Sequence, residues 1–516
     1  MTSAQLLLLS PLPLAALVLE TAGRRWTTTR SCSLALAAGI VAMLGLASCA
    51  STGQQHPSSA LVRITWLGLV VDLSALVVGL TVLSYARRNL AFDPSGRRFA
   101  SATALVLGGT IVATSGARLS VLCLGWVLTS IGAVAAFAGG GTRRTRNRMA
   151  LVLGLGDLAL LLALGILWWA CGDASLSSLA GTEHALNHHV LTLGPIGVHL
   201  GAVVAVLMVL AVAARAGQAP LPGWLPSTVE ASTPTSALLH AGVVNAGGYL
   251  LVVATPLTVA SRAGDALLIA IASLSVVLGA AAARHRPDRK GQLAISTVAQ
   301  MGFMLLSIGV GAPAVAIAHL VGHAQYKSSR FLGAGGAVEL ATTERRFARP
   351  ASLGQVPAMA SALVSGAIVA AGAWWVLGPA ASRADHVLGA GASFMIAATA
   401  TWAVLAGGAQ GSLRRRLLGA VVVGVGVDAL LSRAIAESTS LHLGTTGVSL
   451  AAGLGALAVL GIAVHVGGRV PATAPVVTAS LAGFQAPIGT VAVPRRTPAR
   501  PTSRLEVPPA RAEVLA

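Results

Sequence analysis

The sequence predicts an all-α membrane protein that crosses the bilayer many times. Of its 516 residues, 55% are hydrophobic and only 10% are charged, and the mean hydropathy is +0.79. A soluble domain usually carries about 25% charged residues. Apolar runs long enough to span a bilayer also recur along most of the chain. These observations together predict a polytopic helical protein with about 13 to 15 transmembrane helices.

The apolar runs can be placed one after another along the chain. We expect helices near 4–20, 32–50, 65–85, 99–117, 119–139, 150–170, 196–214, 228–253, 265–283, 293–311, 313–340, 355–378, 387–408, 417–432 and 446–467. The segment 469–516 is rich in Pro, Thr, Ala and Arg and has little hydrophobic periodicity. It predicts a disordered tail on the cytoplasmic side.

Basic residues cluster in every second connection between these runs. The clusters contain Arg24, Arg25 and Arg30; Arg87, Arg88, Arg97 and Arg98; Arg143, Arg144, Arg146 and Arg148; Arg284, Arg286, Arg289 and Lys290; Arg345, Arg346 and Arg349; and Arg414, Arg415 and Arg416. Cytoplasmic loops of membrane proteins carry such an excess, which predicts an outside N-terminus and a cytoplasmic C-terminus. The net charge of +19 has this topology as its simplest cause. No basic surface interleaved with aromatic residues indicates nucleic-acid binding.

Metal, redox and nucleotide motifs are absent from the sequence. Cys32, Cys49, Cys123 and Cys171 are widely spaced and form no zinc, haem or redox pattern, and no dinucleotide fingerprint or Walker loop occurs. His184, His188 and His189 fall in the connection 171–195, where a polar loop explains them better than a metal site. We therefore expect no cofactor in this chain and no chemistry of its own.

The stretch 215–252 interrupts the pattern of membrane helices. Pro220, Pro222, Pro226 and Pro234 fall within fifteen residues, with Glu230 among them. Each proline removes a backbone donor and disfavours continued helix, so a helix must stop and restart here. A broken helix at membrane depth is tolerated only inside protein or beside a polar cavity, which indicates an ion or substrate path.

Ionisable residues inside the apolar runs are candidates for that path, because burying a charge in a membrane is costly. Asp72, Asp157, Arg215 and His240 are such residues. Each also has a purely structural interpretation. His240 could be a satisfied core histidine, Asp157 could neutralise a neighbouring arginine, and Asp72 could be a hydrogen-bond acceptor in helix packing.

The most specific pattern is His319, His323 and Lys327 in AIAHLVGHAQYKSSR. Steps of four residues place them on one face of a helix over about 12 Å. Histidine changes its charge near neutral pH, and lysine can exist in either form when buried. The spacing therefore predicts a proton relay, with a structural polar seam as the alternative.

Several separated motifs resemble the antiporter-like subunits of respiratory complex I and of Mrp antiporters. They are PLPGWLPSTVEASTPTSALLHAG, KGQLAISTVAQMGFMLLSIG at 290–309 and HLVGHAQYKSSRFLGAG at 319–335, with VDLSAL at 71–76 and LGLGDLAL at 154–161. The resemblance implies two inverted five-helix repeats, each with a broken helix, at 99–253 and 254–408. Transmembrane helices at 1–98 and 409–468 would flank them. His240, His319, His323 and Lys327 fall on positions that carry the ion relay in that family, and Arg215 falls where a lysine is usual.

Within that family, HAGVVNAGG, SYARRNLAFDPSGRRF and LGWVLTS are similar to the DabB branch. DabB is the membrane subunit of a two-component inorganic-carbon pump of bacterial cell membranes. The resemblance implies H⁺ or Na⁺ as the transported ion, a lipid environment, and a large soluble DabA-like partner at the cytoplasmic face. That partner would hold the zinc that hydrates CO2. This chain would only couple an ion gradient to the hydration reaction in the partner.

The sequence departs from the wider family at the first half-channel. A glutamate is usual where Val127 stands, paired with a lysine where Arg215 stands. Arginine does not release its proton as lysine does. Arg215 is then either a fixed charge or the partner of Asp157 or Glu230. The second half-channel, which contains His319, His323 and Lys327, is the better candidate for ion conduction.

Three functions remain open from the sequence. The first is a cation-conducting subunit of an inorganic-carbon pump. The second is a proton-pumping subunit of a complex I-like or hydrogenase-like assembly. The third is a membrane anchor that docks a soluble enzyme without conducting ions.

Overall fold

The computed structural model describes most of the apolar part of the chain. The described residues are 5, 9–21, 26–51, 61–137, 140–172, 186, 189–193, 196–258, 261–286, 288–336, 355–379, 381–406 and 411–438. The helix expected at 446–467, the tail 469–516 and most of the connection 171–195 lie outside these residues, with His184 and His188.

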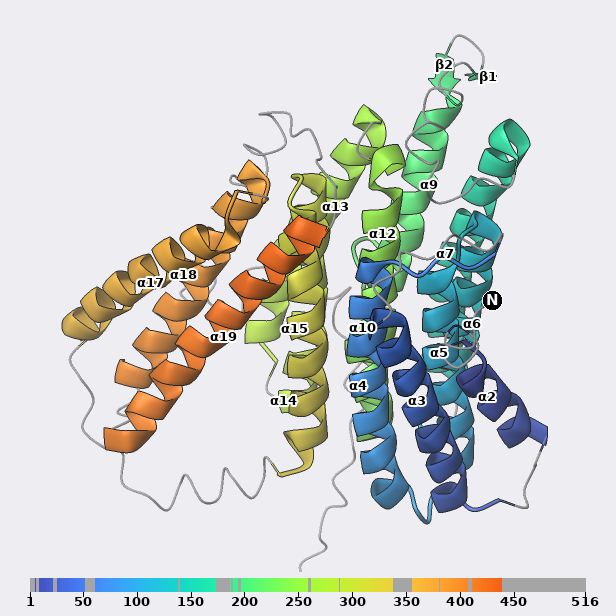
Figure 1. Ribbon diagram of the computed structural model, residues 1–516, viewed down its shortest axis with the longest axis horizontal. Coiled ribbons are helices and arrows are strands. Elements are labelled where there is room, and N and C mark those ends of the chain that lie inside the picture. The colour runs from blue at the N-terminus through green and yellow to red at the C-terminus, as the bar shows by residue number, and fades with distance from the viewer. Residues whose placement is uncertain are drawn as a thin grey trace, which may run out of the picture.

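Long helices run back and forth through the molecule (Figure 1). The first part of the chain forms α2 (Pro11–Thr21), α3 (Thr28–Ser51), α4 (Trp66–Asn89), α5 (Gly96–Ser115), α6 (Leu119–Phe137) and α7 (Arg143–Cys171). The short strands β1 (Val190–Leu193) and β2 (Ile196–His199) pair antiparallel before α9 (Leu200–Arg215).

The second part begins with short segments. They are α10 (Trp224–Ser227), the 3-10 turn η2 (Thr228–Glu230), α11 (Thr233–Leu238), the π-helix η3 (Leu239–Val243) and α12 (Asn245–Thr258). Long helices follow again as α13 (Arg262–Arg284), α14 (Arg289–Gly309) and α15 (Pro313–Leu332), with the turn η4 (Gly333–Gly336). The described chain ends with α17 (Gln355–Leu377), α18 (Arg383–Ala406) and α19 (Gly411–Ser438).

The prediction of an all-α polytopic membrane protein is confirmed. Every apolar run expected between residues 4 and 432 overlaps a helix. Eight of the described helices are long and apolar enough to cross a membrane. This count by length and composition covers the described residues alone and is smaller than the 13 to 15 expected. The two inverted repeats stay a prediction, and α14, α15, α17, α18 and α19 are each continuous over their described residues.

Several helix boundaries differ from the expected ones, and three of the differences have a local cause in the sequence. The run 196–214 starts with β2 and becomes helical only at Leu200. The run 228–253 is divided into η2, α11, η3 and α12, because Pro226 and Pro234 interrupt helical hydrogen bonding on either side of Glu230. The run 313–340 leaves the α-helix at Leu332, where four residues of sequence GAGG follow. Glycine is a poor helix former, which accounts for the earlier end.

A repeated cap pattern starts three of the membrane helices. The side chains of Thr65, Ser261 and Asp288 accept hydrogen bonds from the backbone N–H of the glycine three residues later. Ser, Thr and Asp are the preferred residues at this position, because a helix leaves its first N–H groups unpaired. The pattern fixes the starts of α4, α13 and α14.

The alternating course of the helices gathers the arginines at one face. These arginines include Arg87 and Arg88 at the end of α4, Arg143 at the start of α7 and Arg289 at the start of α14. The opposite ends carry exposed tryptophans, namely Trp168 and Trp169 on α7 and Trp374 and Trp375 on α17. Tryptophan is enriched at membrane–water interfaces, which suits helices that end there.

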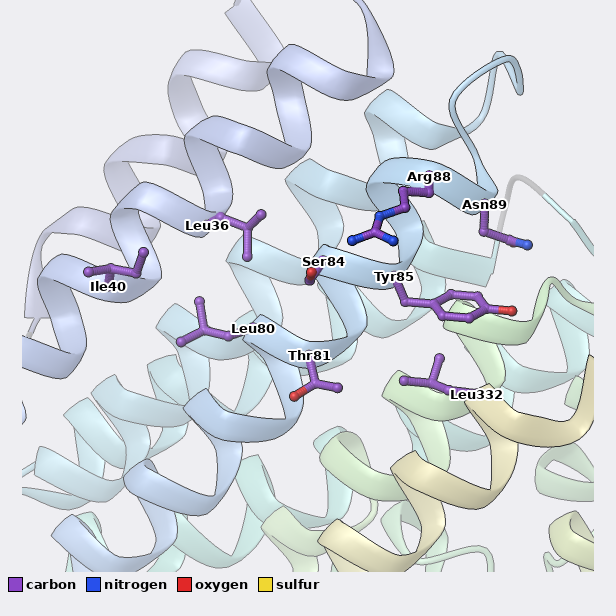
Figure 2. Close-up of a pocket in the computed structure, with 9 residues that line it drawn as sticks. All are labelled: Leu36, Ile40, Leu80, Thr81, Ser84, Tyr85, Arg88, Asn89 and Leu332. Carbon is purple, nitrogen blue, oxygen red and sulfur yellow. The ribbon is translucent and has the colours of Figure 1, made fainter.

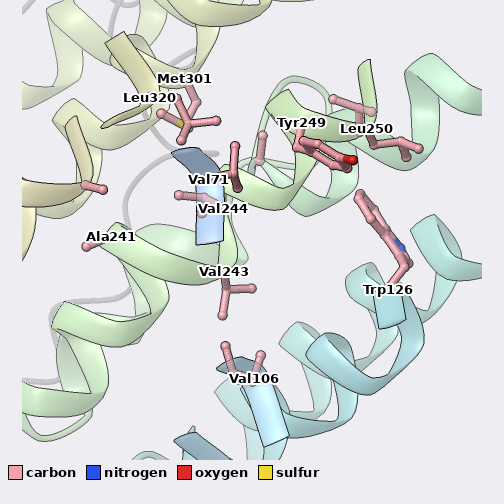
Figure 3. Close-up of a cluster of buried hydrophobic side chains, with 14 of the residues drawn as sticks. Val71, Val106, Trp126, Ala241, Val243, Val244, Tyr249, Leu250, Met301 and Leu320 are labelled. Carbon is pink, nitrogen blue, oxygen red and sulfur yellow. The ribbon is translucent and has the colours of Figure 1, made fainter. Parts of the chain in front are cut away.

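The apolar core lies where the two parts of the chain meet (Figure 3). Ala241, Val243 and Val244 of the η3 region lie at its centre and are buried. Side chains from α4, α5, α6, α12, α14 and α15 surround them, including Trp126 and Tyr249. The irregular stretch of the chain is therefore enclosed by regular helices.

The helices α5 and α6 approach each other closely at Gly125. A Cβ added at Gly125 would overlap the backbone of Gly109 and Ala113 in α5. We expect Gly125→Ala to lower the free energy of unfolding by about 1–3 kcal/mol, as overpacking does. Gly154→Ala in α7 is the matched control, because nothing lies within 4 Å of its added Cβ. Thermal unfolding in mild detergent measures both, and equal midpoints for the two variants would contradict this packing.

Candidate ion-translocation site

The helix break lies between Arg215, the last residue of α9, and Thr233, the first of α11. Gly217 follows α9 with a φ of 61°, a left-handed conformation that glycine adopts without steric cost. Pro220, Pro222 and Pro226 lie within the break. Pro234 occupies the first turn of α11, where its missing N–H costs nothing. The sequence therefore both ends one helix and starts the next.

Side chains satisfy the backbone groups that the break releases. The Ala219 N–H donates to Ser275 Oγ in α13 at 2.9 Å. Gln218 Nε2 donates to the carbonyl of Ala216 at 2.9 Å and to that of Val298 in α14 at 3.2 Å. Trp224 Nε1 donates to the Ala214 carbonyl at 2.9 Å. The break is thus buried against α13 and α14, as irregular backbone at membrane depth must be.

Two charged residues hold the far end of the break. Glu230 accepts hydrogen bonds from the Thr142 N–H at 3.2 Å and from Thr145 Oγ1 at 3.0 Å, at the start of α7. Lys290 of α14 donates to the Val229 carbonyl at 2.9 Å and to the Ala231 carbonyl. Glu230 therefore joins the break to α7 and does not pair with Arg215.

Arg215 lies at the centre of the first polar cluster and is 1% exposed. Its Nη1 donates to Thr129 Oγ1 at 2.6 Å. Its Nη2 lies 2.6 Å from Ser130 Oγ and 3.1 Å from Asp157 Oδ1, and it also donates to the Trp126 carbonyl. The guanidinium carbon is 4.0 Å from the centre of the Trp126 ring. The cation is thus held from several sides.

Asp157 of α7 balances the charge of Arg215. Its Oδ1 also accepts from Trp126 Nε1 at 2.8 Å and from Ser130 Oγ at 2.9 Å. Val127, where the wider family usually has a glutamate, lies on the same helix as these partners and is only partly buried. The carboxylate therefore comes from α7 instead of α6. Because arginine keeps its proton, the geometry is that of a permanent ion pair.

Asp72 lies apart from this ion pair. It is 1% exposed in α4, and its Oδ1 accepts from Thr114 Oγ1 of α5 at 2.7 Å. The Thr114 carbonyl accepts in turn from the Tyr249 hydroxyl of α12 at 2.9 Å. This chain of hydrogen bonds connects three helices, which matches the structural interpretation of Asp72 as an acceptor in helix packing.

His240 begins the second polar cluster and is completely buried in the π-helix η3. Its Nε2 is 2.8 Å from Thr228 Oγ1 in the break, and its Nδ1 is 3.2 Å from Thr297 Oγ1 in α14. Its ring stacks on Phe331 of α15 with centroids 4.7 Å apart. Thr228 Oγ1 donates its one proton to the Leu225 carbonyl at 2.6 Å, and Thr297 Oγ1 donates its proton to the Leu293 carbonyl at 3.0 Å. In this arrangement both hydroxyls can accept from the imidazole, and each can donate to it only after turning away from its carbonyl.

Lys327 of α15 is completely buried next to α14. Its Nζ donates to the Leu293 carbonyl at 2.8 Å and to Ser296 Oγ at 2.6 Å. Neither α14 nor α15 contains an aspartate or glutamate. Lys327 therefore has only neutral partners on these two helices, whereas Arg215 has a carboxylate.

His319 and His323 continue from Lys327 along α15. Their ring centroids are 6.0 Å apart. His323 is 4% exposed, and both of its ring nitrogens lack a hydrogen-bond partner among the described residues. His319 Nε2 and Gln300 Oε1 of α14 are likewise buried without a partner there. Buried polar atoms nearly always have partners, so these four atoms are candidates for contact with bound water or an ion.

The sequence-predicted residues thus form two clusters and two separate sites. Arg215 joins Asp157, and His240 joins the row of His319, His323 and Lys327, while Asp72 and Glu230 contact neither cluster. The partners on α14 were not predicted, although Leu293, Ser296, Thr297 and Gln300 follow the spacing of a single helix face. Asp428, half-buried in α19, and Asp385, which accepts from the Val315 N–H, were also missed.

Removing the carboxylate tests whether the ion pair is structural. Asp157→Asn would leave the buried Arg215 cation without a counter-charge, so we expect a loss of about 3–5 kcal/mol in the free energy of unfolding. Glu437→Gln is the control, because Glu437 forms an ion pair with Arg433 at the surface. The side chains of Arg433 and Glu437 are 45% and 49% exposed. That pair should contribute about 1 kcal/mol or less. Chemical unfolding in detergent measures both, and similar small losses would refute the permanent pair.

Comparisons with known proteins identify relatives of this chain. The probable inorganic carbon transporter subunit DabB of Hydrogenovibrio crunogenus is 44% identical over 145 residues, which are 28% of each chain. The protein of the same name from Bacillus subtilis is 31% identical over 303 residues, which are 58% of this chain and 57% of that protein. NADH-ubiquinone oxidoreductase chain 5 of Schizophyllum commune is 28% identical over 54% of this chain and 41% of its own length. The chain thus matches between 28% and 57% of the length of these relatives.

Solved structures and a family model place the chain more broadly. The Mrp complex from Dietzia sp. superimposes with a TM-score of 0.60 at 23% identity, over 95% of this chain and 58% of that one. The archaeal membrane-bound sulfane sulfur reductase gives 0.56 at 16% identity, over 88% and 75%. These two likenesses show the fold. The family model for the membrane region of NADH:quinone oxidoreductases and Mrp antiporters matches residues 117–406, more than half of the chain. The chain therefore belongs to the NADH:quinone oxidoreductase/Mrp antiporter family.

Proposed function

We propose that this chain is the cation-translocating membrane subunit of an energy-coupled complex that takes up CO2 or bicarbonate. The observation that carries the proposal is the buried row of His240, Lys327, His323 and His319 between α14 and α15. Ionisable residues inside a membrane are costly and usually mark an ion path. The similarity to proteins named as inorganic carbon transporter subunits supplies the link to carbon.

In this proposal, the ion moves along the contacts of these residues. It starts at Thr228 in the break, passes through His240 to Thr297, and continues along α14 to Ser296 and Lys327. From Lys327 it follows His323 and His319 along α15, which separates Lys327 from His319 by about 12 Å of helix. The unpartnered nitrogens of His323 lie in the middle of this row.

Proton transport fits the row better than sodium transport. Sodium requires oxygen ligands, as other hard cations do, whereas the row consists of nitrogen groups that become positively charged themselves. Two threonine hydroxyls flank His240, and each can pass a proton to or from the imidazole when it turns away from its own backbone carbonyl. The first polar cluster contributes a fixed charge, because Arg215 remains paired with Asp157.

The carbon chemistry belongs to a partner in this proposal. The described part of the chain contains no group of three or more His, Cys, Asp or Glu side chains that could hold a metal ion. We assign zinc and CO2 hydration to a large soluble DabA-like subunit. It would dock on the arginine-rich face, which the excess of positive charge makes the cytoplasmic face of a bacterial cell membrane. The N-terminus would then lie outside and the C-terminus inside.

Lys327→Ala tests the row in cells that depend on this transporter. It removes the cation that donates to Leu293 and Ser296, so we expect loss of bicarbonate-dependent growth and carbon uptake while the complex still assembles. Arg330→Ala is the matched control, because Arg330 lies one turn further along α15 and is exposed. Uptake of labelled inorganic carbon, with the subunit ratio of the purified complex, gives the measurement. Normal uptake in the Lys327 variant would support a membrane anchor instead.

A pull-down of the tagged chain in mild detergent from its own host tests the partner. We expect a large soluble subunit in about equal amount, with zinc in the complex by elemental analysis. Partners that contain iron–sulfur clusters or react with quinones would replace the carbon-pump proposal with a redox-driven pump. The row in α15 could still conduct protons in that assembly, so this test addresses the partner and the Lys327 test addresses conduction.

A further inference from the structure

A surface groove runs along α4 between α3 and α15 (Figure 2). Its volume is about 850 Å³, and it opens toward the outside of the helix bundle. Leu36 and Ile40 of α3 form one wall, and Leu332 of α15 lies on the other side. Ile40 is 54% exposed, although it lies in the middle of an apolar helix.

The chemistry of the groove changes along its length. Leu80 of α4 faces Leu36 and Ile40 at the deep end, within the apolar part of the membrane helices. Ser84 follows one turn later, and Arg88 lies two turns later at the end of α4. Leu80 and Arg88 are therefore separated by about 12 Å along the helix axis. An apolar slot thus leads to a polar, positively charged opening.

Arg88 is available for a ligand at that opening. Its side chain is exposed, and it makes no hydrogen bond or ion pair with the described residues of the chain. Arg87 lies next to it, and neither the groove lining nor α4 beyond Asp72 contains an acidic residue. The charge of the opening is therefore positive, at the same face where the other arginine clusters lie.

We propose that this groove binds an anionic phospholipid, with its phosphate on Arg88 and one acyl chain against Leu36, Ile40 and Leu80. An apolar slot of this depth matches a hydrocarbon chain, and guanidinium groups bind phosphate oxygens through paired hydrogen bonds. Basic pockets between transmembrane helices at the cytoplasmic side bind lipid headgroups in this way. Leu332 is five residues beyond Lys327, so the bound lipid would also contact the end of the helix that carries the polar row.

The test is native mass spectrometry of the full-length protein, first stripped of lipid in detergent and then titrated with phosphatidylglycerol or phosphatidylcholine. We expect one phosphatidylglycerol to bind about fivefold more tightly than phosphatidylcholine, because both lipids carry a phosphate but the choline cation of phosphatidylcholine offsets its attraction to Arg88. Arg88→Gln should abolish this preference. Arg98→Gln is the matched control, because Arg98 is exposed in the same basic cluster but does not line the groove.

A second pair of variants tests the slot without changing charge. Ile40→Trp should fill the groove and lower binding of both lipids, whereas Leu44→Trp should not, because Leu44 is 60% exposed on α3 outside the groove. Unchanged phosphatidylglycerol binding by the Arg88 or Ile40 variant would overturn the proposal. Complete displacement of the lipid by inorganic phosphate would also overturn it, because the site would then recognise a free anion. None of these results depends on whether the chain conducts protons.

Discussion

Backbone groups released by a broken helix cannot bind water inside a membrane, and this constraint organises the centre of the molecule. Residues 216–232 meet it with side chains from their own segment, with Ser275 of α13 and with Lys290 of α14. The bond from Gln218 to the Val298 carbonyl fixes the break against α14. Thr297, the preceding residue, then contacts His240. The contacts that hold the break against α14 therefore also place His240 next to Thr297, one residue from Ser296, which contacts Lys327.

The two polar clusters solve the problem of buried charge in opposite ways. Arg215 has a carboxylate, two hydroxyls, a carbonyl and an aromatic ring around it, and it never needs to lose its charge. Lys327 has one carbonyl and one hydroxyl and no carboxylate on the two helices beside it. A lysine can be neutral in such surroundings, and an arginine cannot. The difference supports our proposal that the first cluster has a static role and the second a translocating role.

Much of this architecture could be predicted from the sequence, because its signals are local. Apolar length predicted the helices, and the four prolines marked the interruption after Arg215. The spacing of His319, His323 and Lys327 placed them on one helix face, and His319 and His323 do stack along α15. The ion-path role of these residues stays a prediction. Asp157 was correctly among the two partners considered for Arg215.

Contacts between distant segments were harder to predict. Nothing local distinguished Ser296 and Thr297 from other small polar residues of a membrane helix, because their role depends on α15 and η3 lying beside them. Glu230 was expected near the ion path, but it caps the start of α7, 85 to 88 residues away in sequence. The strands β1 and β2 were missed because each is only four residues long.

The central claim is that protons cross this protein through the row on α15. The most direct measurement is proton flux into liposomes that contain the purified complex, followed with a pH-sensitive dye under an imposed membrane potential. The account predicts that the wild-type complex conducts and that Lys327→Gln, which keeps a polar group of similar length but cannot carry a charge, does not. Equal flux through both proteins would contradict it and move the path away from α14 and α15.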